Sequence, residues 1–268
     1  MFNTLSLENL QRNVPSIFTE DSAERTSNKY QHISTAKVID GLLGEGFMPT
    51  WAAQCKCRIA AKKAYTKHML RFRHIDARPT SSGLYPELVL INSHDGLSSY
   101  RLMAGIYRMV CSNGLIAGTS YDEIRVRHQG DIVGEVIEGT YKIIEDSKNM
   151  IESADNMSSI ALSNPEKEIF AEAAHTIRFD NSHAGESIDP LKLLSARRID
   201  ELNKNDLFTV FNVTQENLIK GGLRGYAKDK NGYAKRISTR GIKSIDQNTA
   251  LNRALWTLAE KMMQLRNV

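Results

Sequence analysis

The stretch that decides the fold is residues 88–114, which read LVLINSHDGLSSYRLMAGIYRMVCSNG. Its first four residues are all apolar, and so short an apolar run is typical of a strand covered on both faces. Residues 92–96, NSHDG, supply turn and helix-capping side chains. From Leu97 onward the apolar residues recur at helical spacing around most of a cylinder. We therefore expect a central strand, a sharp turn and a buried helix that ends at Gly114.

The one polar strip on this expected helix carries two arginines, Arg101 and Arg108. They are about two helical turns apart, a little over ~10 Å along the axis. A buried helix that exposes two cations in one line is suited to hold an anion.

The NSHDG turn admits two readings, which the sequence leaves open. In the first, Asp95 caps the helix and His94 supports the turn. In the second, the start of the helix binds an anion through its free backbone N–H groups. A hydrolase triad is remote, because Ser93, His94 and Asp95 are consecutive and point in different directions.

Two segments upstream alternate in a way that predicts a basic sheet face. In residues 51–59 the apolar positions, beginning with Trp51, alternate with polar ones, and residues 65–75 do the same. If the two strands pair as an antiparallel hairpin, five cations gather on one outward surface. These are Lys56, Arg58, Lys67, Arg71 and Arg73.

Charge is unevenly distributed, although the formal net charge is only +4. The segment 56–78 contains eight basic residues and one acidic residue, and the segment 214–243 contains eight basic residues and two acidic ones. Segregation of this kind indicates contact with a polyanion. Two solvated, lysine-rich faces are the alternative.

The later basic block is a glycine-punctuated loop, residues 221–243, with Tyr226 and Tyr233 among its charges. Unstacked bases bind to rings on which they can stack and to cations that follow the backbone. The candidate contacts in this loop are Arg224, Tyr226, Lys235, Arg236 and Arg240. A flexible, solvated loop is the alternative.

Other chemistries find little support in the sequence. No apolar run is long enough to span a bilayer, and residues 1–15 lack the layout of a signal peptide, so we expect a cytoplasmic protein without membrane contact. Cys55, Cys57 and Cys111 fit buried thiols better than a metal site. The sequence has no phosphate-binding or dinucleotide motif and no suitably placed pair of carboxylates. We therefore expect no enzymatic activity, no catalytic residues, no metal and no cofactor.

These patterns predict an α+β fold, in which an antiparallel sheet with a β-β-β-α core packs on helices and a mostly helical C-terminal half follows. Residues 1–30 form an N-terminal arm, 31–140 the core with the basic sheet face, and 141–268 the mainly helical region. The last region contains the basic loop 221–243 and ends in a helix over 245–266, whose leucines have the 3-4 spacing of a packed seam.

Four motifs resemble a family of plasmid- and phage-borne proteins of unknown function, often labelled phage/plasmid-like protein. They are SHDGLSSYR at 93–101, RMVCSNGL at 108–115, NVTQENLIKGG at 212–222 and SIDQNTALNRALWTLAE at 244–260. Together they extend over most of residues 34–268. The resemblance implies a protein of a mobile element, and it carries over no catalytic residues because the family's biochemical role is not established.

The order of the expected elements is also similar to the β-β-β-α core of single-strand annealing recombinases. An aromatic-led strand at Trp51, a basic hairpin and a buried helix carry this likeness. It implies a basic groove that binds the backbone of single-stranded DNA, and subunits that assemble into rings or filaments.

The resulting hypothesis is a single-stranded DNA binding and annealing or protection protein of a phage or plasmid. It acts without sequence preference and as a homo-oligomer, and its expected partner is DNA in preference to RNA. The alternative is a non-enzymatic interaction protein of a mobile element that inhibits a host defence system.

Overall fold

The computed structural model describes all residues except 1–2, 25, 27–29, 31, 81–82, 109–113, 117–122, 127–131, 180–186, 229–230 and 267–268. The chain divides into two compact units, Met1–Ile151 and Glu152–Val268. The boundary lies inside a long helix, α3 (Ile132–Ser158), whereas the division expected from the sequence stood before residue 141.

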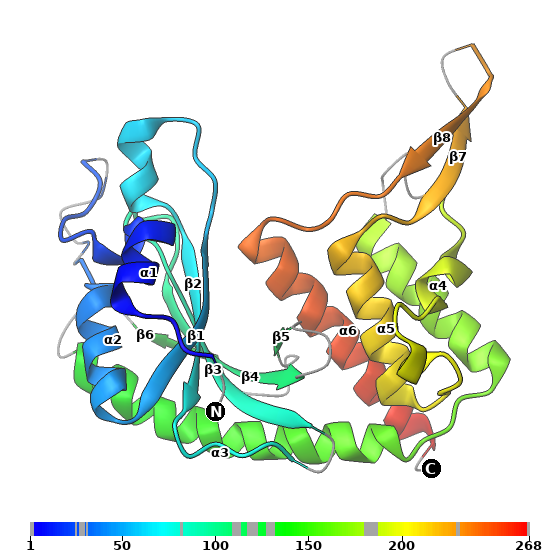
Figure 1. Ribbon diagram of the computed structural model, residues 1–268, viewed down its shortest axis with the longest axis horizontal. Helices are drawn as coiled ribbons and strands as arrows, with labels where there is room; N and C mark the ends of the chain where they lie inside the picture. Colours follow the sequence, from blue (N-terminus) through cyan, green and yellow to red (C-terminus); the bar gives the residue numbers. More distant parts are fainter. Residues whose placement is uncertain are drawn as a thin grey trace. The chain divides into compact units, whose positions relative to one another are not determined.

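The first unit is built on an antiparallel sheet (Figure 1). Its elements are α1 (Leu7–Asn13), η1 (Pro15–Phe18), α2 (Thr35–Gly44), β1 (Phe47–Gln54), η2 (Ala60–Tyr65), β2 (His68–His74), β3 (Leu84–Asn92), β4 (Tyr100–Arg108), β5 (Gly114–Ile116) and β6 (Glu123–Val126), with most of α3. Among the described residues six strands form this sheet, in the order β1-β2-β3-β4, and β5 and β6 pair with different halves of β4.

Strand β3 is central, as its apolar run predicts. Leu88, Val89, Leu90 and Ile91 are each at most 1% exposed. The strand pairs with β2 on one side and β4 on the other, so both of its edges and both of its faces are covered. The prediction of a doubly covered strand at 88–91 is confirmed.

The prediction of a helix after the NSHDG turn is wrong, because residues 100–108 form strand β4. Antiparallel pairs run from Leu84↔Arg108 to Ile91↔Arg101. Apart from the half-buried Arg101 and Tyr107, every residue of β4 is buried, so apolar side chains are required on both faces. An apolar run of this kind fits a buried helix as well as a buried strand, and periodicity alone does not separate the two.

Helix α2 begins where its capping residue predicts. The Ser34 hydroxyl accepts a hydrogen bond from the Lys37 backbone N–H at 3.3 Å. The helix buries Val38, Ile39 and Leu42 beside strand β1. A side chain that satisfies a free N–H group at a helix start is local information, and the sequence carries it directly.

The second unit is mainly helical. It contains α4 (Asn164–Phe179), η3 (Pro190–Leu194), η4 (Ile199–Glu201), α5 (Leu207–Lys220), β7 (Arg224–Lys228), β8 (Ala234–Ser238) and α6 (Ile245–Arg266). Every residue of α5 from Leu207 to Leu218 is buried, which makes α5 the centre of this unit. Helix α6 packs against it, with the ring of Trp256 edge-on to Phe211 at 5.8 Å.

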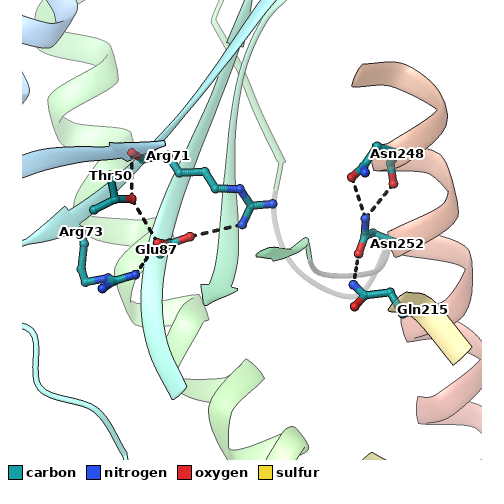
Figure 2. Close-up of polar contacts among 7 residues, drawn as sticks. All are labelled: Thr50, Arg71, Arg73, Glu87, Gln215, Asn248 and Asn252. Carbon is teal, nitrogen blue, oxygen red and sulfur yellow. Dashed lines mark hydrogen bonds and ion pairs between the residues drawn. The ribbon is translucent and has the colours of Figure 1, made fainter. Parts of the chain in front are cut away.

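A ladder of carboxamides also joins α5 to α6 (Figure 2). Gln215 donates to Asn252 Oδ1 at 2.5 Å, and Asn252 donates to the backbone oxygen and the side-chain oxygen of Asn248, both at 2.8 Å. Gln215 and Asn252 are fully buried, so these hydrogen bonds fix the register of the two helices.

The α+β class, the antiparallel sheet and the mostly helical C-terminal half are therefore confirmed, as is a helix over 245–266. The loop expected over 221–243 contains a hairpin, β7–β8. The likeness to annealing recombinases depended on a β-β-β-α order, whereas the structure has a fourth strand in place of that helix. Within the described part of the chain, every helix is too short or too polar to cross a membrane.

Candidate functional site

Arg71 and Arg73 lie on one face of β2, as predicted, but both are buried. They donate to the carboxylate of Glu87 on β3, with Arg71 Nη1 3.2 Å from Oε2 and Arg73 Nη2 2.8 Å from Oε1 (Figure 2). Thr50 of β1 donates its hydroxyl to Oε1 at 3.2 Å. The side chain of Glu87 has no exposed surface. An internal ion-pair cluster therefore stands where an open basic surface was expected.

Arg73 is further enclosed by two tyrosine rings. Its guanidinium carbon lies 4.3 Å from the ring centroid of Tyr85 on β3 and 4.4 Å from that of Tyr107 on β4. A cation between two ring faces is attracted by the quadrupole of each. Arg73 thus ties three strands together and is occupied by its own sheet.

The remaining cations of the expected sheet face lie outside the strands. β1 ends at Gln54, so Lys56 and Arg58 are exposed in the connection that follows. Lys67 is half-buried, one residue before β2 begins. The prediction that these residues share a single sheet face with Arg71 and Arg73 is wrong, because β1 ends at Gln54 and β2 begins at His68, so Lys56, Arg58 and Lys67 lie outside both strands.

The expected helical ridge of Arg101 and Arg108 does not exist. Both residues belong to β4, where an odd separation along the chain places them on opposite faces of the strand. Arg101 is half-buried and Arg108 is 8% exposed. They do not act together on one anion.

The NSHDG turn is a structural turn. Asp95 Oδ1 accepts hydrogen bonds from Ser93 Oγ at 2.8 Å and from the Leu97 backbone N–H at 3.0 Å. No helix begins in the described residues 92–100, so the anion site proposed for a helix start is wrong. Tyr30 donates to the Ser93 carbonyl at 3.1 Å, and burial raises the pKa of its hydroxyl to about 12.

Three histidines gather beneath this turn. The ring of His94 lies 4.4 Å from that of His32 and 5.3 Å from that of His68. His68 Nε2 is 2.9 Å from the Thr35 hydroxyl, and burial lowers the pKa of His68 to about 4. Among the described residues no group of His, Cys, Asp and Glu side chains is arranged to hold a metal ion. The three rings therefore pack against one another beneath the turn.

The cysteines are less buried than expected. Cys55 and Cys57 are free thiols and half-buried at the end of β1, because the strand that would have turned them inward stops at Gln54. Cys111 lies outside the described residues.

The hairpin β7–β8 keeps the expected cations and an aromatic ring exposed. Tyr226 on β7 is directly opposite Arg236 on β8, so the two side chains share a face. Arg224 is two residues before Tyr226 and lies on the same face. All three are exposed, and 69% of the Tyr226 surface is open. We call Arg224, Tyr226 and Arg236 the ribbon face.

Lys235 lies on the other face of the hairpin, where it is paired across the strands with Ala227. It is exposed as well. Arg240 is exposed beyond the end of β8. Three of the five candidates in this region therefore lie on the ribbon face. Lys235 does not, because successive side chains along a strand point to opposite faces.

The ribbon is docked on the rest of its unit through its other face. A Cβ atom added at Gly225 would collide with the Ser187 carbonyl oxygen and lie 2.8 Å from Ile188 Cδ1. Lys192 donates its ammonium to the Arg224 carbonyl at 2.6 Å. Because Gly225 points opposite to Arg224 and Tyr226, this docking leaves the ribbon face open. Figure 1 shows the hairpin extending away from helices α5 and α6.

The base of the ribbon is closed by hydrogen bonds to the end of α5. Thr239 accepts from the Leu223 backbone N–H through its hydroxyl at 3.1 Å and donates its own N–H to the Leu223 carbonyl at 2.9 Å. Gly221 ends α5 at a φ of 66° and receives a hydrogen bond from Arg197 at 2.5 Å. The ribbon thus has a rigid attachment and an exposed cationic face.

Fold and site together define a two-unit α+β protein that carries an exposed basic β-ribbon. The chain belongs to the family described as Domain of unknown function (DUF932), whose profile matches residues 23–256. It is similar to two proteins of Escherichia coli (strain K12), UPF0380 protein YfjQ and UPF0380 protein YafZ. Each is 42% identical over 259 residues, which cover 97% of this chain and 92% of the relative. No solved structure matches.

Proposed function

We propose that this protein binds single-stranded DNA, without sequence preference, through the ribbon face of β7–β8. The observation that carries the proposal is the exposed cross-strand pair Tyr226–Arg236 with Arg224 beside it. An open tyrosine ring with two cations on the same face matches what an unstacked strand presents, which is a base face next to phosphates.

The geometry of the strand supports this proposal. Arg224 and Tyr226 are two residues apart on β7, which is about 7 Å along the strand. This spacing is comparable to that of neighbouring nucleotides in an unstacked strand. Among the described residues Arg224 and Arg236 form no ion pair, so both charges remain available to phosphates.

Stacking and phosphate contacts have different signatures. Stacking on Tyr226 contributes on the order of 1 to 3 kcal/mol per base. Each phosphate that an arginine neutralises adds about 0.7 to the slope of log affinity against log salt for a single strand. Neither contribution depends on base identity, which supports binding without sequence preference.

Annealing and assembly belong to the same proposal. The single tyrosine of each ribbon face covers few nucleotides, so several copies are needed to protect a strand, and a homo-oligomer in ring or filament form would supply them. A plasmid or phage setting fits such an activity. Light scattering with and without an oligonucleotide tests assembly, and the rate at which complementary strands pair tests annealing.

The experiment that tests binding is fluorescence anisotropy with a labelled single-stranded oligonucleotide of random sequence and its duplex. We expect Tyr226→Ala to lower affinity for the single strand roughly 5- to 150-fold, and Tyr226→Phe to keep it, because the ring is retained. Equal affinity of the wild-type protein and Tyr226→Ala would remove stacking from the proposal. No binding even at low salt would remove nucleic acid altogether.

The second candidate function is an interaction module of a mobile element that inhibits a host defence system. Exposed apolar side chains in the segment before α5 favour it, namely Leu191, Ile199 and Leu202, with Ile199 exposed to 89%. Such side chains are suited to a protein partner. Failure of the wild-type protein to bind DNA would make this the leading function.

A further inference from the structure

Trp51 is an exposed aromatic ring in the first unit, far along the chain from the ribbon. Alternation along β1 predicts an inward position for it, yet 43% of its surface is open. The cause is a register shift between Pro49 and Trp51, which inserts Thr50 as an extra residue in β1. Trp51 therefore lies opposite Arg71, on the face that holds the Glu87 cluster.

Arg71 contacts the ring of Trp51 from one side. Its guanidinium carbon lies 5.9 Å from the indole centroid. Arg71 itself is held by its ion pair with Glu87 and is 6% exposed, so it has little freedom to move. An indole that is supported on one side and open elsewhere is ordered before any ligand arrives, which lowers the entropic cost of stacking.

Arg71 has hydrogen-bonding capacity that Glu87 does not use. Arg71 and Arg73 share the single carboxylate of Glu87. Arg71 uses one of its nitrogens, Nη1, for that carboxylate, and its other two find no hydrogen-bond partner among the described residues. These two nitrogens are absent from the buried polar atoms that lack a partner, so they reach the surface and can donate to an anion there.

We propose that Trp51 and Arg71 form a nucleotide-binding site, in which a base stacks on the open surface of the indole and the unused donors of Arg71 attract its phosphate. The site contains no ribbon residue, so it is independent of the function proposed above. A free nucleotide and a nucleotide within a single strand offer the same chemistry, and the experiment distinguishes these two sources.

The chain has two tryptophans, and this permits a direct test. Trp256 is fully buried, whereas Trp51 is exposed, so ligand stacking quenches the emission of Trp51 selectively. The probes are dAMP, a ten-residue oligo(dA) and inorganic phosphate, each titrated into the full chain. We expect saturable quenching by dAMP or by the oligonucleotide, none by phosphate alone, and none in Trp51→Phe.

Quenching by dAMP identifies a site for free nucleotides, and quenching by the oligonucleotide alone identifies a site for single strands. Affinity for the quenching probe, measured by calorimetry, should fall roughly 5-fold or more in Trp51→Ala and less than about 3-fold in Trp51→Phe. Thermal unfolding of both variants checks that they fold.

Two outcomes overturn the inference: no quenching by either nucleotide probe, or equal affinity of Trp51→Ala and the wild-type protein. The ribbon is tested separately by repeating the dAMP and oligonucleotide titrations in Tyr226→Ala. Quenching that persists in this variant supports the Trp51 site even if the ribbon does not bind DNA. Quenching that disappears in Tyr226→Ala would show that Trp51 does not form a site of its own.

Discussion

At the scale of single residues, Glu87 determines what the sheet of the first unit can do. Its carboxylate accepts from Arg71, Arg73 and Thr50 in a place without solvent. The two arginines would otherwise be buried cations, which is costly. Because of Glu87 on β3, Arg71 and Arg73 form buried ion pairs inside the sheet, where the sequence predicts an open basic surface.

We predict that Glu87→Ala destabilises the protein by about 3 to 5 kcal/mol, because it leaves two buried guanidinium groups without their carboxylate. Urea unfolding at neutral pH measures the change. The matched control is Glu145→Ala, which removes an exposed ion pair with Lys148 at 2.6 Å and should cost less than about 0.5 kcal/mol. Similar losses in both variants would show that the cluster contributes nothing beyond a surface pair.

At the scale of elements, the sequence predicts best where the signal is local. Ser34 caps α2 by bonding to a backbone group three residues away, and the helix over 245–266 has leucines at 3-4 spacing, of which Leu251 and Leu255 are buried. The sequence does not distinguish strand β4 from a helix. The residues of β4 are apolar because both faces of the strand are buried, and this burial arises only in the assembled sheet.

The same reasoning explains the fate of the candidate site. Alternation correctly put Arg71 and Arg73 on one side of β2, but the acid opposite them comes from a strand whose register the sequence does not reveal. The inserted residue Thr50 likewise moves the side chain of Trp51 to the opposite face of β1 from the one that simple alternation predicts. In the ribbon the candidates remain predictions, and the pairing of β7 with β8 places three of them, Arg224, Tyr226 and Arg236, on one face.

The docking of the ribbon gives a prediction at this scale. We expect Gly225→Ala to destabilise the protein by about 1 to 3 kcal/mol, because a methyl group there collides with the Ser187 carbonyl. Thermal unfolding measures the loss. Gly44→Ala is the control, since a Cβ at Gly44 meets nothing within 4 Å. A Gly225→Ala variant as stable as that control would contradict the docked position of the ribbon.

At the scale of the whole molecule, the chain combines a sheet-based unit and a helical unit, each with an exposed aromatic ring beside arginines. The ring is Trp51 in the first unit and Tyr226 in the second. The clearest cationic surface, however, is the ribbon face, because the arginines beside Trp51 are buried. The account of function therefore depends on β7–β8.

Neighbouring residues on β8 provide the most direct measurement, because Lys235 and Arg236 carry the same charge on opposite faces of the ribbon. The measurement is the salt dependence of single-stranded DNA binding for Arg236→Ala and Lys235→Ala. We predict that Arg236→Ala weakens binding and lowers the slope of log affinity against log salt by about 0.7, while Lys235→Ala leaves that slope unchanged. Equal changes in both variants, or no change in either, would contradict a contact through the ribbon face.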